Sequence, residues 1–110
     1  MRRQIIVVVA ALALTIVTSS ALAAVRVTER PGRVSPGDKA SVTITVSPKA
    51  RCTIGVYYST GRSAAHGLGS KYAKTITWTW TVGSATKAGT WPIKIECGKS
   101  GTAQTTVVVR

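Results

Sequence analysis

The sequence contains few of the residues from which enzymes build catalytic centres. Its 110 residues include three acidic side chains, one histidine and two cysteines, and phenylalanine is absent. Glu29, Asp38, Glu96 and His66 leave almost nothing for a pair of acid/base groups, a metal cage or a catalytic triad. We therefore expect neither an ordinary hydrolase nor a metalloenzyme, and we predict no catalytic residue, no metal site and no cofactor.

The N-terminal segment has the composition of a secretory signal peptide. Two arginines follow the first methionine, residues 5–17 form an apolar run, and the small residues of SSALA occupy positions 19–23. This order of basic, apolar and small residues predicts export, with cleavage after Ala23.

Cleavage at that position divides the chain into a signal peptide, residues 1–23, and a mature domain, residues 24–110. The alternative is an uncleaved membrane anchor, since the apolar character continues to Ala24 and a spanning helix needs about 20 residues. In both cases we expect the following domain to lie outside the cell.

The mature domain contains two cysteines, Cys52 and Cys97, and neither belongs to a CxxC pair. In an oxidising exterior, such a pair is more often a structural disulfide than a reactive or metal-binding site. A domain of this size buries only about 60–65% of the surface that its unfolded chain exposes. A Cys52–Cys97 disulfide is therefore expected to contribute much of its stability.

Alternation of apolar and polar residues with a period of two runs through the mature domain and predicts an all-β fold. In the clearest example, residues 75–82 (TITWTWTV), apolar side chains occupy one face and four threonines the other, as in a strand with one buried and one solvated face. The spacing of the turn signals suggests a sandwich. The expected strands are residues 25–30, 40–46, 51–58, 75–82, 90–97 and 103–109.

In an immunoglobulin-like strand order, the strands at 51–58 and 90–97 are antiparallel neighbours within one sheet. Cys52 begins the first of them and Cys97 ends the second, so their Cα atoms should lie within disulfide reach. We therefore predict a bridge within one sheet, unlike the bridge between sheets of antibody domains. A bridge found between the sheets would contradict this strand order.

Three stretches resemble small immunoglobulin-like modules of bacterial secreted and surface proteins: VSPGDKASVTITVSPKARCTIGVYY, STGRSAAHGLGSKYAK and TITWTWTVGSATKAGTWPIKIEC. The resemblance covers roughly residues 34–109, and its most specific parts are WTWTVG and AGTWPIKIEC. It implies an antiparallel, immunoglobulin-like β-sandwich of six to seven strands with one disulfide, used for display, adhesion or spacing. It implies no ligand and carries over no functional residue.

The longest connection between expected strands, residues 59–74, is a candidate ligand-binding loop, because long loops on rigid scaffolds often carry binding sites. In the alternative interpretation, residues near 70–74 form a short edge strand and the rest is a solvated crossover. The candidate ligand-binding side chains are Arg62, His66, Lys71, Tyr72 and Lys74.

Three tryptophans allow two interpretations. Trp78 and Trp80 share the apolar face of their strand, so we expect them in the core rather than on a sugar-stacking platform. Trp91, which begins a strand and precedes Pro92, is expected to be the most exposed of the three.

Positive charge dominates the sequence, with 15 Lys and Arg against three acidic residues and a formal net charge of +12. Removal of residues 1–23 takes away only two arginines, so 13 basic and 3 acidic residues remain, a net charge of +10. The basic residues form no run, and no nucleic-acid partner is expected for an exported protein.

Charge of this size attracts polyanions, such as anionic cell-envelope polymers and lipid headgroups. The charge can equally be no more than a solvated surface. An alternative function is a protein-binding or adhesion module, which contacts an extracellular protein through the 59–74 loop or a sheet edge. No feature of the sequence indicates an oligomeric state.

Overall fold

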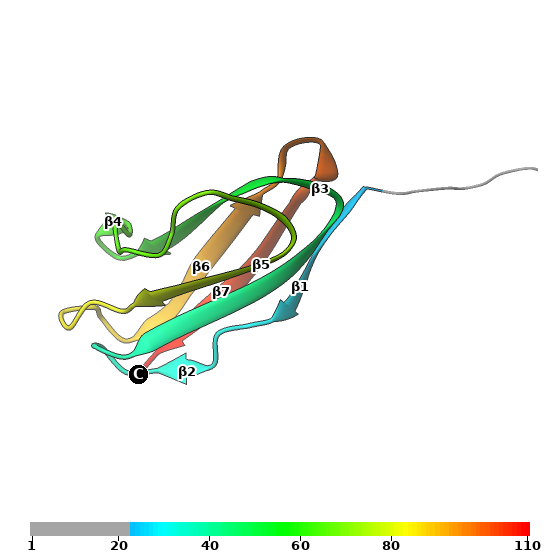
Figure 1. Ribbon diagram of the computed structural model, residues 1–110. Coiled ribbons are helices and arrows are strands. Elements are labelled where there is room, and N and C mark those ends of the chain that lie inside the picture. Colours follow the sequence, from blue (N-terminus) through cyan, green and yellow to red (C-terminus); the bar gives the residue numbers. More distant parts are fainter. Residues whose placement is uncertain (1–22) are drawn as a thin grey trace, which may run out of the picture.

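The alternating segments form strands in the computed structural model, which describes residues 23–110 (Figure 1). The predicted signal peptide lies outside these residues except for its last position, Ala23. The elements are β1 (Ala24–Glu29), β2 (Arg33–Val34), β3 (Lys39–Tyr58), β4 (Gly61–Arg62), β5 (Lys71–Thr81), β6 (Gly89–Glu96), the 3₁₀ helix η3 (Gly98–Ser100) and β7 (Thr102–Val109).

Two layers share the long, bent strand β3. Its first half pairs with β1 and β5 and forms the first layer; its second half pairs with β6, which pairs with β7 and forms the second layer. The sequence predicted two strands here, 40–46 and 51–58, separated by a turn, and this is wrong. Pairing to β5 resumes after an irregularity between Thr45 and Ala50, because β5 follows β3 through its bend.

One pair of strands departs from the antiparallel expectation. After β1 the chain crosses from the first layer to the second, where β2 runs parallel to the end of β7 through the pairs Arg33 with Val108 and Val34 with Val109. All other strand pairs in the described residues are antiparallel. With seven strands, two layers and one disulfide, the domain is an immunoglobulin-like β-sandwich.

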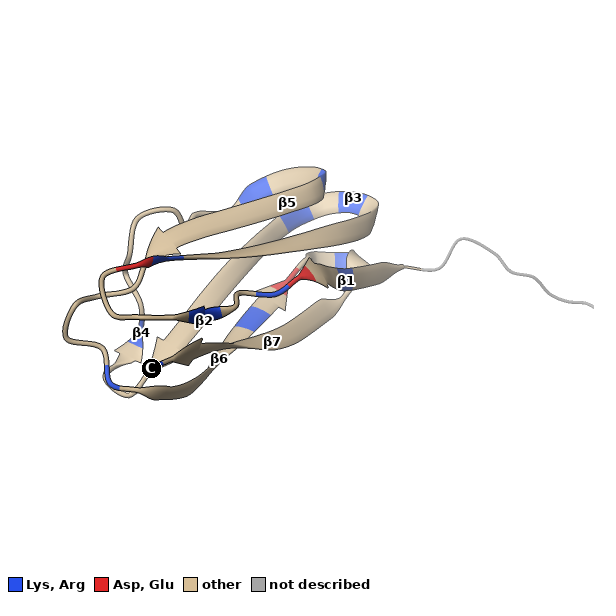
Figure 2. Cartoon of the chain, turned by 90° about the horizontal axis from the view of Figure 1, so that it is seen from below, with Lys and Arg blue, Asp and Glu red and all other residues tan. Residues whose placement is uncertain are grey.

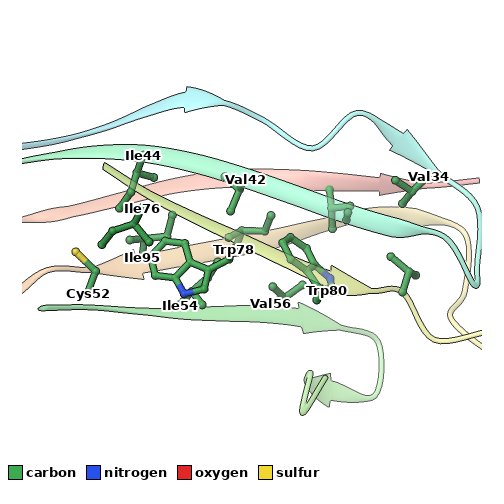
Figure 3. Packing of buried hydrophobic residues seen from close by; sticks show 14 of the residues in the cluster. Val34, Val42, Ile44, Cys52, Ile54, Val56, Ile76, Trp78, Trp80 and Ile95 are labelled. Atoms are coloured by element: carbon green, nitrogen blue, oxygen red, sulfur yellow. The ribbon is translucent and has the colours of Figure 1, made fainter. Parts of the chain in front are cut away.

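The core lies between the two layers and is built from the inward face of each strand. Trp78 and Trp80 are its largest side chains, at 0% and 2% exposure, and both lie between the layers in Figure 3. The prediction that they belong to the core is confirmed. Trp91 is half-buried, as expected for the most exposed of the three. Residues 24–110 contain every described strand and the whole described core, so this segment is a packed unit by itself.

The disulfide joins Cys52 and Cys97, whose Cα atoms are 4.1 Å apart. Both residues are fully buried and lie one position beyond the cross-strand pair Thr53–Glu96 of β3 and β6. The bridge is therefore within one layer, as predicted from the strand order.

Candidate functional site

The five candidate binding residues do not lie in one open loop. Arg62 belongs to β4 and His66 to the connection 63–70, while Lys71, Tyr72 and Lys74 belong to β5. The expected loop bounds of 59–74 are therefore wrong, as is the expected strand start at residue 75. The strand β5 begins earlier than expected because residues 71–73 form cross-strand pairs with residues 50–52 of β3. The alternative of a strand near 70–74 was closer to the structure.

The side chain of Arg62 forms a hydrogen bond with the backbone of its own domain. Its Nη2 donates to the carbonyl of Ile54 at 3.0 Å, and the N–H of Ser63 donates to the carbonyl of Val56 at 2.7 Å. Both carbonyls belong to the second half of β3, at the edge of the second layer. These donors therefore cover an edge strand, where unpaired backbone groups invite pairing with other chains.

The connection 63–70 covers the edge of the other layer in a similar way. Nε1 of Trp78 donates to the carbonyl of Gly69 at 2.7 Å, and Leu68 is partly buried against the core. Just after the connection, Nζ of Lys71 donates to the carbonyl of Thr77 at 2.8 Å. The segment thus closes one side of the sandwich, between β5 and the second half of β3 (Figure 1).

Gly67 lies tightly against the backbone of β5, and its replacement by alanine is expected to destabilise the domain. Its φ is +96°, in the region that favours glycine, and a Cβ would overlap the carbonyl oxygen of Thr79. A strained backbone of this kind costs about 1–3 kcal/mol. Urea denaturation of Gly67→Ala should show that loss.

The matched control is Gly69→Ala, two residues further on. A Cβ at Gly69 has no neighbour within 4 Å, so its effect on the free energy of unfolding should stay within about 0.5 kcal/mol. Equal stability of the two variants would contradict a close approach at Gly67.

Two tyrosines on the surface lie beside cations. The Tyr57 side chain folds over Gly55, where a Cβ would lie 2.7 Å from its hydroxyl oxygen and 2.8–2.9 Å from the ring. Nζ of Lys94 lies 5.5 Å and Cζ of Arg62 6.0 Å from the centre of that ring. Sequence reasoning missed this cluster, because the register between β3 and β6 brings Lys94 opposite Gly55.

Tyr72 forms the second cluster, near the bend of β3. It is 56% exposed, and Nζ of Lys49 lies 5.2 Å from its ring centre. Arg51 is the cross-strand partner of Tyr72. Of the five candidate residues, Tyr72 thus lies beside two basic residues of β3, Lys49 and Arg51.

A small hollow lies at the opposite end of the sandwich, between the 59–60 turn and the 83–88 connection. Its volume is about 170 Å³, and it is lined by Tyr58, Ser59, Thr60, Gly83, Ala85 and Thr86. Pockets that enclose small molecules usually measure about 300–1,000 Å³. The hollow has room for little more than a few waters.

The acidic residues and the histidine do not form a polar centre. Asp38 accepts a hydrogen bond from the N–H of Ser35 at 3.3 Å in the turn before β3, as its PGD context suggests. Within residues 23–110 no three His, Cys, Asp or Glu side chains gather where a metal ion could be held. No helix in the described part of the chain is long and apolar enough to cross a membrane.

Basic side chains are distributed over the whole surface. All thirteen Lys and Arg of the described residues are exposed. Figure 2 shows them on both layers and at both ends of the sandwich. They are Arg26, Arg30, Arg33, Lys39, Lys49, Arg51, Arg62, Lys71, Lys74, Lys87, Lys94, Lys99 and Arg110.

Comparison with known proteins identifies the fold. No protein-family model matches the sequence, and no curated protein matches it significantly. The CARDB domain of the PF1109 protein from Pyrococcus furiosus, solved in complex with di-metal ions, is similar in structure, with a TM-score of 0.53 and 15% identity over 79% of this chain and 86% of that domain.

The twitchin kinase region from C. elegans, which includes fibronectin and immunoglobulin modules, matches with a TM-score of 0.50 and 14% identity. The match covers 80% of this chain but 16% of the twitchin chain, so it concerns one module of a much larger protein. At these identities the similarity supports the immunoglobulin-like fold alone.

Proposed function

We propose that this chain is an exported, non-enzymatic immunoglobulin-like domain that binds the anionic polymers or lipid headgroups of a bacterial envelope through distributed positive charge. The observation that carries the proposal is the exposure of all thirteen basic residues against three acidic ones. In this proposal, residues 1–23 direct export and are cleaved, with an uncleaved anchor as the alternative.

The distribution of the basic residues over the domain supports binding to an anionic polymer or surface without a discrete binding site. Lys49 and Lys74 lie where the pairing of β3 with β5 is irregular, and Lys99 lies on η3. Lys39 begins β3, and Lys87 lies in the connection before β6. A polyanion or a charged surface can approach such a domain in several orientations, since the attraction is long-ranged and depends on ionic strength.

The absence of a catalytic role is part of the same proposal. It is supported by the small volume of the hollow beside Tyr58 and by the positions of Asp38, in the turn before β3, and His66, in the connection 63–70. Adhesion through residues 59–74 is less favoured, because Arg62, Ser63 and Lys71 already donate to backbone carbonyls of the domain.

Binding of residues 24–110 to vesicles of phosphatidylcholine with phosphatidylglycerol is expected to fall steeply between low and physiological salt. Each basic residue near an anionic surface contributes about 1 kcal/mol, and salt screens that contribution. Co-sedimentation measures the bound fraction, with neutral phosphatidylcholine vesicles as the control. Binding that persists at high salt, or that equals binding to neutral vesicles, would contradict the proposal.

Two triple variants test whether the charge is distributed. Lys49→Gln/Lys74→Gln/Lys99→Gln and Lys39→Gln/Lys87→Gln/Lys94→Gln remove equal charge from different regions, and each removes one lysine beside a tyrosine ring. Both should weaken vesicle binding to a similar extent, by up to about 3 kcal/mol, the contribution of three basic residues that lie near the surface. Loss of binding in only one of them would mean that a localised site, not distributed charge, binds the envelope.

A further inference from the structure

The two layers together have four outer edges, and three of them are protected. Bonds from Arg62 and Ser63 cover the second half of β3, and the connection 63–70 covers β5. The third edge, β1, has an irregular register near its end and carries Arg26 and Glu29. Covering segments, bulges and charges are the means by which natural sheets prevent pairing with another chain.

The fourth edge, β7, has none of these features. Its sequence, TAQTTVVV, contains no charged residue, proline or glycine, and its register with β6 is regular from Thr102 to Val109. Within the described residues, β2 pairs only with Val108 and Val109, so residues 102–107 have no strand on their outer side. In Figure 2, β7 has no blue or red segment along its length.

The outer side of β7 presents backbone hydrogen-bonding groups. The N–H of Arg110 donates to the carbonyl of Val34 in β2 at 3.0 Å, which shows that Arg110 directs its N–H away from β6. Because backbone groups alternate in direction along a strand, those of Thr102, Gln104 and Thr106 also point outward.

Apolar side chains lie partly exposed along the same side of the sandwich. Val25 and Val27 of β1 and Ala103 of β7 are only half-buried although they face the core. On the opposite side, Ala65 and Leu68 are half-buried against the core in the same way, but they belong to the connection 63–70, which lies over that edge. Among the described residues no such connection lies over the side bordered by β7, so this side of the sandwich is open.

We propose that the outer edge of β7 pairs with the same edge of a second copy of this chain, antiparallel and about a two-fold axis. With the axis at Gln104, Gln104 faces its counterpart, and Thr102 faces Thr106 of the other copy. Thr–Thr pairs across strands are favourable, and directly opposed like charges are unfavourable. Because β7 carries no charged residue, pairing with a second copy places no like charges opposite one another along this edge, although the two domains are both basic. A charged partner strand would find no opposite charge along β7.

The salt dependence of this pairing is expected to oppose that of envelope binding. Two copies of the domain repel each other through their net charge, and salt screens that repulsion. Sedimentation velocity of residues 24–110, measured over a range of protein and salt concentrations, should show a monomer–dimer equilibrium that strengthens as salt rises. Hydrogen exchange at the amides of Gln104 and Thr106 should slow as the protein concentration rises.

The test variant is Gln104→Lys/Thr106→Lys, which places charges on the edge strand. Its matched control, Thr75→Lys/Thr81→Lys, adds equal charge to exposed positions of β5, whose edge is covered. The first variant should weaken dimerisation at least tenfold, and the second should have a much smaller effect. Thermal unfolding of both variants checks that each remains folded.

Three results would overturn the proposal: a monomer at all salt and protein concentrations up to the millimolar range, a dimer weakened equally by both variants, or a dimer that salt dissociates. None of these bears on vesicle binding, so the proposed envelope function stands or fails separately.

Discussion

Replacement of Cys52 and Cys97 together by alanine is expected to lower the free energy of unfolding by about 4 kcal/mol. The disulfide closes a loop with a sequence separation of 45, and in the chain-entropy model most of its contribution comes from restricting the unfolded chain. For a domain of this size, a loss of that magnitude lowers Tm by roughly 15–30 °C. It would remove much of the stability of a small domain, which is typically about 5–15 kcal/mol.

Thermal unfolding followed by circular dichroism measures this effect on residues 24–110. Comparison of the oxidised protein, the reduced protein and the double alanine variant separates the cross-link from the side-chain volume, because reduction leaves both side chains in the core. Reduced and oxidised protein with the same Tm would show that the disulfide does not stabilise the domain. Vesicle binding by the variant should be unchanged wherever it remains folded.

Trp78→Ala is expected to cost about 3–5 kcal/mol, the range for a fully buried aromatic side chain. The side chain is 0% exposed between the layers, so its removal leaves a large cavity. It also removes the bond from Nε1 to the carbonyl of Gly69, which holds the connection 63–70 against β5. A second effect should therefore appear locally, as loosening of that connection.

Urea denaturation measures the global loss, and limited trypsin digestion after Arg62 and Lys71 measures the local one. Trp91→Ala is the control, because Trp91 is half-buried and its Nε1 donates to the carbonyl of Lys87 in a different connection. It should be less destabilising and should leave the trypsin sites near residues 63–70 protected. Equal stability loss in the two variants would contradict the different burial of these tryptophans.

The strands were predictable because alternation with a period of two is a local property of the chain. The segment 75–82 shows this most clearly, since Trp78 and Trp80 are buried while the threonines between and beside them are exposed. The errors arose where pairing is not local. The two strands expected at 40–46 and 51–58 form one bent strand, β3, because β5 pairs with it on both sides of the bend.

The candidate site was predicted less well than the fold. The five polar residues of 59–74 were grouped because they are close in sequence, but the structure divides them among β4, a covering connection and β5. The cluster around Tyr57 was missed, since its cations come from β4 and β6 and meet through strand register. No local signal in the sequence marks such a meeting.

The amino-acid sequence by itself determined the all-β class, the inward-facing residues, the disulfide pair and the excess of positive charge. Each of these depends on composition or on the alternation of neighbouring residues. Tertiary structure alone decided that residues 63–70 cover one side of the sandwich and that β7 remains open on the other. The physical reason is that an edge becomes covered or open only through contacts between segments far apart in the chain.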